Sequence, residues 1–352
     1  MARPPAPETS DTLPASVSGE HVQHTLLDVQ ARRIIAFDTL VDAVAPADVV
    51  AIGEEHHHPD IQAFALYLLQ AVAQRRPQQL ALAMEFLERD QQATVDAYLA
   101  GTIDHLTLQN RLGVSAAFMH DYFPLLHYAR QQALPVIAMN TPRRIARQVA
   151  REGLEKTLPQ LSSRDRAHLP VTLSAIAPSY RSYFLEAVAA HHQLHGEQAE
   201  YFVQASHLKD DTMAEALARF LAARPGYTIL ALAGRFHFDY GKAIPALLQQ
   251  RRQHTVMPRI TAMAVAGDRM INLQQFARDD MAHYIWFSPS APEERSRRGT
   301  RVITLLQEFW RDCLEPRQGG IRQSSNARHR QEQVVFVCMA TSPQRGLPLR
   351  AD

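Results

Sequence analysis

Two Gly-x-x-His motifs contain the residue types that could do chemistry in this chain of 352 residues. The first, Gly53–His56, follows the apolar run Val49–Ile52, and the second, Gly234–His237, follows the apolar run Tyr227–Ala233. Short apolar runs of this kind are typical of buried parallel strands. A glycine lets the backbone turn sharply where a strand ends. We therefore expect each motif to bring its histidine back over the edge of a sheet.

Two more predicted strands end on polar residues. Glu85 follows an apolar run that starts at Leu80, and Asn140 follows a run that starts at Pro135. Because the carboxyl ends of parallel strands share one edge of the sheet, where ligands bind, we expect these side chains to lie near the two histidines. Two imidazoles with one or two carboxylates can hold a divalent metal. They can equally form a hydrogen-bonded acid–base cluster, and the sequence leaves both interpretations open.

A pair of arginines follows the third of these strands. The sequence Asn140-Thr141-Pro142 predicts the start of a helix, because a capping residue precedes a proline. Arg143 and Arg144 then fall in the first helical turn, where the helix dipole disfavours a cation. We interpret the two arginines, together with Asn140, as part of the pocket, with a role in binding an anion. The alternative is a simple helix cap.

A second cluster lies in a stretch, about 143–224, that shows only helical patterns. Tyr180 and Tyr183 precede His191 and His192 within one predicted helix. A tyrosine phenolate can hold ferric haem, so this helix is a candidate haem site. The alternative is an amphipathic helix whose aromatic side chains pack against the protein and whose histidines are solvated.

The elements that must position these residues alternate between strands and helices. A first helix is expected over about 27–44, and two late strands are expected over 260–265 and 283–287. Such alternation predicts an α/β fold, with a mostly parallel sheet flanked by helices. Because it pauses between the third strand and the later strands, the block at about 143–224 is predicted to be an all-helical insertion.

The two ends of the chain differ in composition from the α/β domain, which we expect to span 27–290. Residues 1–26 are predicted to be a disordered leader, because their first part is rich in proline, serine and threonine. Residues 291–352 are rich in arginine, serine, glutamine and proline. We interpret this segment as a loosely ordered tail.

The composition excludes several classes of protein. Lys and Arg total 37 and Asp and Glu total 36, so the net charge of +1 gives no global attraction to nucleic acid or to an anionic membrane. No apolar stretch approaches the roughly 18 residues that span a bilayer. The two cysteines are too few for a disulfide framework. The chain as written shows no apolar secretion signal, so a cytoplasmic location is expected.

Five short segments, taken in order, resemble the ChaN-like haem-binding family, which belongs to a superfamily with the Tiki proteins and the erythromycin esterases. The segments are Val50–His56 followed by Gln62, Ala83–Phe86, Asn140–Pro142, Gln204–Ala214 and Ala233–Gly241. Their order and spacing make the resemblance specific over roughly 30–290.

The resemblance to ChaN implies an iron-regulated lipoprotein of haem or iron uptake, in which two protomers enclose a pair of haems through the helical subdomain. The axial ligand in that family is a tyrosine with a histidine nearby. We assign the ligand role to Tyr183 or Tyr180, with His191 or His192 as helper. The implied partners are haem and a second copy of the chain. The family also implies the cell envelope, an expectation that requires an N-terminus longer than the one written here.

The resemblance to the Tiki proteins implies instead a metal-dependent hydrolase. On that interpretation His56, Glu85 and His237 bind a divalent metal, and Glu54 or Glu55 activates water.

Overall fold

The computed structural model describes residues 17–189 and 196–290. The tail at 291–352, most of the predicted leader, and the candidate haem-site histidines His191 and His192 lie outside the described residues.

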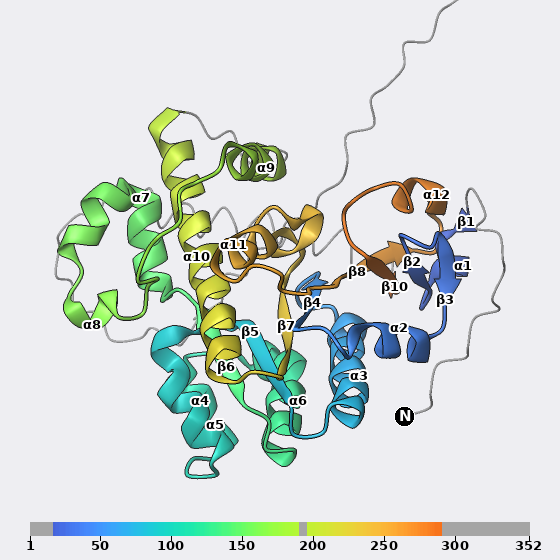
Figure 1. Ribbon diagram of the computed structural model, residues 1–352, viewed down its shortest axis with the longest axis horizontal. Coiled ribbons are helices and arrows are strands. Elements are labelled where there is room, and N and C mark those ends of the chain that lie inside the picture. The colour runs from blue at the N-terminus through green and yellow to red at the C-terminus, as the bar shows by residue number, and fades with distance from the viewer. Residues whose placement is uncertain (1–16, 190–195, 291–352) are drawn as a thin grey trace, which may run out of the picture.

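An eight-stranded sheet forms the centre of the molecule (Figure 1), with the strand order β3-β2-β10-β8-β4-β7-β5-β6. Strands β10, β8, β4, β7, β5 and β6 are parallel to one another, whereas β2 pairs antiparallel with β3 and β10. The predicted α/β fold with a mostly parallel sheet is confirmed. The strands of this sheet are β2 (Leu26–Asp28), β3 (Arg33–Ile35), β4 (Val49–Glu54), β5 (Leu80–Glu88), β6 (Val136–Asn140), β7 (Thr228–Gly234), β8 (Arg259–Ala266) and β10 (Tyr284–Ser290).

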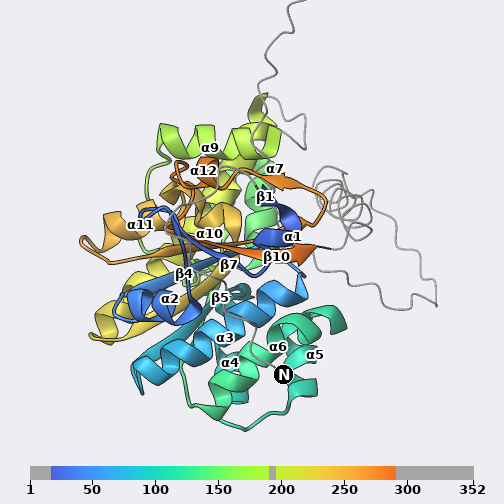
Figure 2. The same ribbon diagram turned by 90° about the vertical axis from the view of Figure 1, so that its right-hand side faces the viewer.

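Helices cover both faces of the sheet, as Figure 2 shows. One layer contains α2 (Phe37–Val44), α3 (Pro59–Arg75), α4 (Gln92–Leu99), α5 (His105–Leu112) and α6 (Ala116–Gln131). The other contains α7 (Arg143–Gln160), α8 (Ser163–Arg166), α9 (Pro178–Ala189), α10 (Gly196–Ala223) and α11 (Ile244–Arg251). Short elements complete the described chain: β1 (Val17–Ser18), α1 (Gly19–Val22), β9 (Met270–Ile271), α12 (Leu273–Phe276) and the 3₁₀ turns η1 (Arg89–Gln91), η2 (Arg235–His237) and η3 (Asp239–Gly241).

The buried strands separate their side chains by the period-two rule of extended backbone. In β4, Val50 and Ile52 join the hydrophobic cluster that α3 and α6 cover. Val49 and Ala51 point to the opposite face and join the cluster under α10 and α11. Alanines occupy this second face in several strands, so that α10 can lie close to the sheet.

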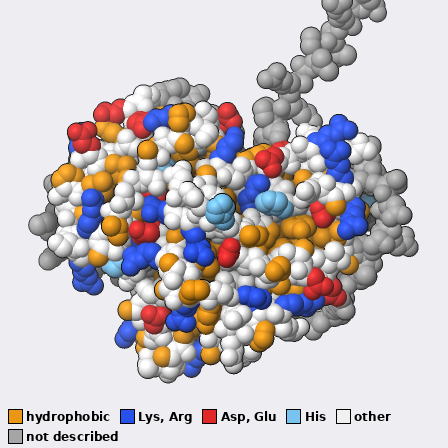
Figure 3. Space-filling model, viewed as in Figure 1, with side chains coloured by type: hydrophobic (Ala, Val, Ile, Leu, Met, Phe, Trp, Pro, Cys, Tyr) orange, Lys and Arg blue, Asp and Glu red, His pale blue; other side chains and the backbone are white. Residues whose placement is uncertain are grey.

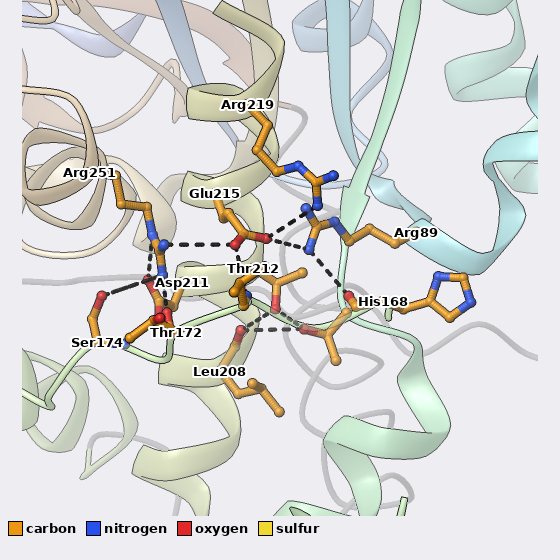
Figure 4. A network of polar contacts seen from close by, with 12 residues as sticks. Arg89, His168, Thr172, Ser174, Leu208, Asp211, Thr212, Glu215, Arg219 and Arg251 are labelled. Carbon is orange, nitrogen blue, oxygen red and sulfur yellow. Dashed lines mark hydrogen bonds and ion pairs between the residues drawn. The ribbon is translucent and has the colours of Figure 1, made fainter. Parts of the chain in front are cut away.

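The helical insertion lies between β6 and β7, as the sequence predicts, and α10 fixes it to the sheet layer. Two carboxylates on α10 collect contacts from several elements (Figure 4). Asp211 accepts hydrogen bonds from the backbone N–H and hydroxyl of Ser174 and from Arg251. Glu215 accepts from Arg89 and from the backbone N–H of Val171. The loop that leads into α9 is thereby tied down across α10.

The first half of the helix expected over 27–44 is wrong. Strands β2 and β3 form a hairpin there, and α2 begins only at Phe37. Arg32 at the hairpin turn has a φ of 53°, which a helix does not permit. Leu26 and Leu27 are buried because β2 pairs with β10, a partner more than 250 positions away.

None of the described helices is long and apolar enough to cross a membrane. On the face shown in Figure 3, acidic and basic side chains are interspersed among hydrophobic ones.

Candidate functional site

The two Gly-x-x-His motifs lie side by side at the carboxyl edge of the sheet. Strands β4 and β7 are neighbours, and Glu54 lies opposite Gly234 in their parallel register. Strand β5 lies on the other side of β7 and supplies Glu85 to the same edge. The predicted convergence of these residues is therefore found, and Glu54, His56, Glu85 and His237 are all buried.

The reason for glycine in the first motif differs from the one that we expected. Neither Gly53 nor Gly234 has a positive φ, so neither supplies a left-handed turn. A Cβ atom on Gly53 would lie 3.1 Å from the Cα atom of Arg235. The absence of a side chain at position 53 thus lets the two motifs pack closely.

His237 is held between two carboxylates. Its Nδ1 lies 2.5 Å from an oxygen of Asp210, on α10, and its Nε2 lies 3.1 Å from Oε1 of Glu85. Burial alone lowers the pKa of this imidazole, but the charges of Glu85 and Asp210 outweigh burial and raise the pKa to about 9. His237 is therefore an imidazolium at neutral pH, and both of its ring N–H groups donate.

Glu85 is saturated by donors from three elements. Its Oε1 accepts from His237 and from Nζ of Lys209, at 3.2 Å, and its Oε2 accepts from the backbone N–H of Gly234, at 2.8 Å. Burial raises the pKa of this carboxyl, yet the positive charges of His237 and Lys209 hold the pKa well below its usual value. With Asp210, the cluster has two carboxylates and two cations.

His56 lies in a different environment, just past the end of β4. Its Nδ1 donates to Oε1 of Glu54 at 2.8 Å, because a carboxylate can only accept. The same carboxylate accepts from the Tyr122 hydroxyl at 2.6 Å and from the Gln62 amide at 2.9 Å. Nε2 of His56 is buried and has no hydrogen-bond partner among the described residues. In the neutral ring this nitrogen is an available base.

Glu55, the other candidate to activate water, forms an ion pair with Arg235 of the second motif. Arg235 donates to it at 3.1 Å, and the backbone N–H of Ala264 donates to it at 3.2 Å. Arg235 also bonds Asp239. Glu55 is therefore part of a buried ion-pair network that fixes η2 against the sheet.

Asn140, Arg143 and Arg144 are bonded to other parts of the protein. The Asn140 amide donates to the backbone carbonyl of Glu85, at 3.0 Å. The Glu88 carboxylate accepts from the backbone N–H of Arg143, at the start of α7. The Arg144 side chain forms ion pairs with Asp90 and Asp165. Carboxylates of the chain itself thus contact both arginines, and the binding of an external anion there stays a prediction.

Tyr180 and Tyr183 lie inside the helical layer. The Tyr180 hydroxyl donates to Asp210 at 2.5 Å and accepts from the Ser206 hydroxyl at 3.0 Å, and burial raises the pKa of its phenol well above the usual value. The Tyr183 hydroxyl donates to the carbonyl of Phe236, on whose ring its own ring stacks. Ligation of haem iron by either oxygen therefore requires that its internal hydrogen bond first breaks.

Asp210, Lys209 and Tyr122 also belong to the site, although the motifs did not predict them. The first two belong to a run of charged residues, Lys209 to Asp211, which lies between Leu208 and Thr212-Met213-Ala214 in the middle of one long helix. That run is the signal that could have found them, because a charged run inside a buried helix needs partners. Tyr122 carries no such signal, since α6 reaches Glu54 only through the tertiary fold.

The predicted divalent metal site is not supported. Across residues 17–189 and 196–290, no group of three or more His, Cys, Asp or Glu side chains could hold a metal ion. The physical reason is that Glu85 and His237 use their oxygens and nitrogens on each other and on neighbouring groups.

Comparisons with known proteins agree with the fold. At 17% sequence identity and a TM-score of 0.57, the chain is similar to the solved structure of cofacial heme binding to ChaN of Campylobacter jejuni, over 74% of this chain and 95% of that chain. An erythromycin esterase mutant in its open conformation matches with 15% identity and a TM-score of 0.38, over 69% of this chain and 76% of that chain.

Among curated proteins, Protein RETICULATA-RELATED 5, chloroplastic, of Arabidopsis thaliana is 24% identical over 270 residues, or 71% of this chain. The chain spans only 35% of the length of that relative. A family model described as haem-binding uptake, Tiki superfamily, ChaN matches residues 40–248, which is more than half of the chain. The protein therefore belongs to the ChaN family of the Tiki superfamily.

Proposed function

We propose that this protein binds haem and takes part in haem or iron uptake. The observation that carries the proposal is the extent of the family match, since residues 40–248 include both the sheet edge and the helical insertion. The similarity to the haem-binding ChaN structure over 95% of that chain supports it. We further propose that two protomers associate when haem is bound.

The ligand to the iron is the part of this proposal that the contacts constrain. Ferric haem takes a phenolate or an imidazole as its axial ligand. Tyr183 is the better tyrosine candidate, because its hydroxyl donates to a neutral carbonyl at 3.0 Å, whereas the Tyr180 hydroxyl donates to a carboxylate. His191 and His192, outside the described residues, stay predicted as helpers.

Titration of hemin into the purified protein tests the proposal through the Soret band. We expect a saturable shift, and a different band position in a Tyr183→Phe variant. Tyr227→Phe is a matched control, because Tyr227 lies at the opposite end of β7 and packs on Phe220. Sedimentation with and without hemin measures the association of protomers. If no saturable shift occurs, the protein does not bind haem in this way.

A second candidate function is hydrolysis by acid–base catalysis without a metal at the strand-end site. The observation that favours it is Nε2 of His56, which is buried and has no hydrogen-bond partner within residues 17–189 and 196–290, while Glu54 holds Nδ1 on the other side of the ring. In such a reaction the proton of an attacking water passes to Nε2, and the Glu54 carboxylate stabilises the imidazolium that forms.

An esterase assay with p-nitrophenyl acetate in the presence of EDTA tests this second function. We expect a rate above that of buffer, which a His56→Gln variant loses and a His254→Gln control keeps, because His254 is an exposed residue far along the chain. Activity that survives in His56→Gln, or no activity in the intact protein, excludes His56 as the base for this substrate.

A further inference from the structure

Two buried hydrogen-bond acceptors near the turn between β4 and α3 have no donor among the described residues. Nε2 of His56 and Oε1 of Gln62 have no hydrogen-bond partner in the part of the chain that the structure describes. His56 has 7% of its surface exposed and Gln62 has 4%. Both residues are anchored at their other polar atom, by Glu54. Buried polar groups are rarely left unpaired in folded proteins, so these two require an explanation.

The hydrogen bonds to Glu54 decide which kind of ligand group can bind Nε2 of His56 and Oε1 of Gln62. Glu54 accepts from Nδ1 of His56, so Nε2 of the neutral ring presents a lone pair. Glu54 also accepts from the Gln62 amide nitrogen, so the amide oxygen is the atom left over. Both open atoms are therefore hydrogen-bond acceptors, which a hydrogen-bond donor satisfies.

The charges near the turn favour the same class of group. Glu54 is buried, and the three groups that donate to it are a tyrosine hydroxyl, an amide and an imidazole. The cations nearby are engaged elsewhere, since Arg235 pairs with Glu55 and Lys209 pairs with Glu85. The turn thus combines a buried negative charge with two open acceptors.

We propose that the β4–α3 turn binds a hydroxyl or a protonated amine through Nε2 of His56 and Oε1 of Gln62, and rejects carboxylates and phosphates. The proposal deepens the second candidate function, on which it rests, by naming its ligand class. Phe86 is partly exposed and lies edge-on to the His56 ring, with ring centres 5.1 Å apart. The Phe86 ring thus forms one wall beside the His56 ring.

Nuclear magnetic resonance of the full chain labelled with ¹⁵N in histidine tests the proposal at pH 8. Three probes of similar size are added in turn: methylammonium, methanol and acetate. We expect methylammonium to move the Nε2 resonance of His56 saturably, at a concentration at least about tenfold below that for any change by acetate, with methanol between them. An equal or larger response to acetate, or no response to any probe, overturns the proposal.

Variants separate the possible failures. Gln62→Met removes one of the two acceptors and is expected to weaken the methylammonium response several-fold, whereas Gln250→Met, at an exposed position, leaves it unchanged. If the spectrum instead shows a proton on Nε2 and none on Nδ1, the acid–base function itself fails. If the tautomer is as described but the probes are not distinguished, only the ligand class is wrong.

Discussion

The charge on His237 predicts a loss of stability at alkaline pH. The pKa of this imidazole rises from 6.5 to about 9 in the folded protein, and each unit of difference between the folded and unfolded states corresponds to about 1.4 kcal/mol. The ring is almost fully buried, so solvent does not screen its two carboxylate partners. The cluster thus contributes about 3 kcal/mol to the free energy of unfolding when His237 is protonated.

The sign follows from which state holds the proton. Between pH 6.5 and about 9 the folded protein keeps the proton and the unfolded chain does not, so stability falls as pH rises. The contribution is complete below pH 6.5 and is lost above pH 9. Glu85 does not interfere in this window, because its pKa is lowered and its own contribution is lost only on acidification.

Urea unfolding followed by circular dichroism, at several pH values from about 6 to 10, measures the effect. The comparison is with His237→Gln, in which every other group still titrates, and each protein is compared with itself across pH. We expect the wild type to lose about 3 kcal/mol more than the variant over this range. An equal pH dependence in the two proteins would refute the assignment of His237 as an imidazolium.

Three further predictions concern the fold and the site. Asp211→Asn breaks a buried ion pair with Arg251, and we expect it to lower the free energy of unfolding in urea by about 3–5 kcal/mol. Arg219→Ala removes an exposed pair and should lower it by under about 1 kcal/mol. Equal losses in the two variants would contradict the buried network. Gly153→Ala places a Cβ atom 2.6 Å from the ring of Tyr201, at a backbone φ of 81°. Its Tm should therefore fall further than that of Gly113→Ala, where the φ is 65° and no neighbour lies within 4 Å of the added Cβ atom. The reverse order of the two Tm values would count against this packing. Dialysis against EDTA should leave the Tm unchanged, because the groups at the strand ends are bonded to one another; a lowered Tm that zinc restores would reinstate the metal site.

The sequence determined the main features of the sheet. The apolar runs before Gly53, Glu85, Asn140 and Gly234 fall on the four strands β4, β5, β6 and β7. A strand that is buried on both faces is a continuous apolar run in the sequence, so it can be recognised without knowing which strands lie beside it. The carboxyl-edge rule then places the polar residues that follow them at one edge. The hairpin of β2 and β3 was not predicted from the sequence, because it depends on pairing with β10, which lies far along the chain.

Only the tertiary structure decided what the two histidines do. The motifs look alike, but His237 contacts Asp210 from α10 and Glu85 from β5, whereas His56 contacts Glu54 from its own motif. Two carboxylates make the His237 ring a buried cation. One carboxylate orients the His56 ring and leaves its Nε2 without a partner among the described residues. Local sequence fixes where a side chain leaves the backbone, but the charges that set its protonation come from elements distant in the chain. The paired motifs therefore located the site, and the packing of α10 against the sheet set its chemistry.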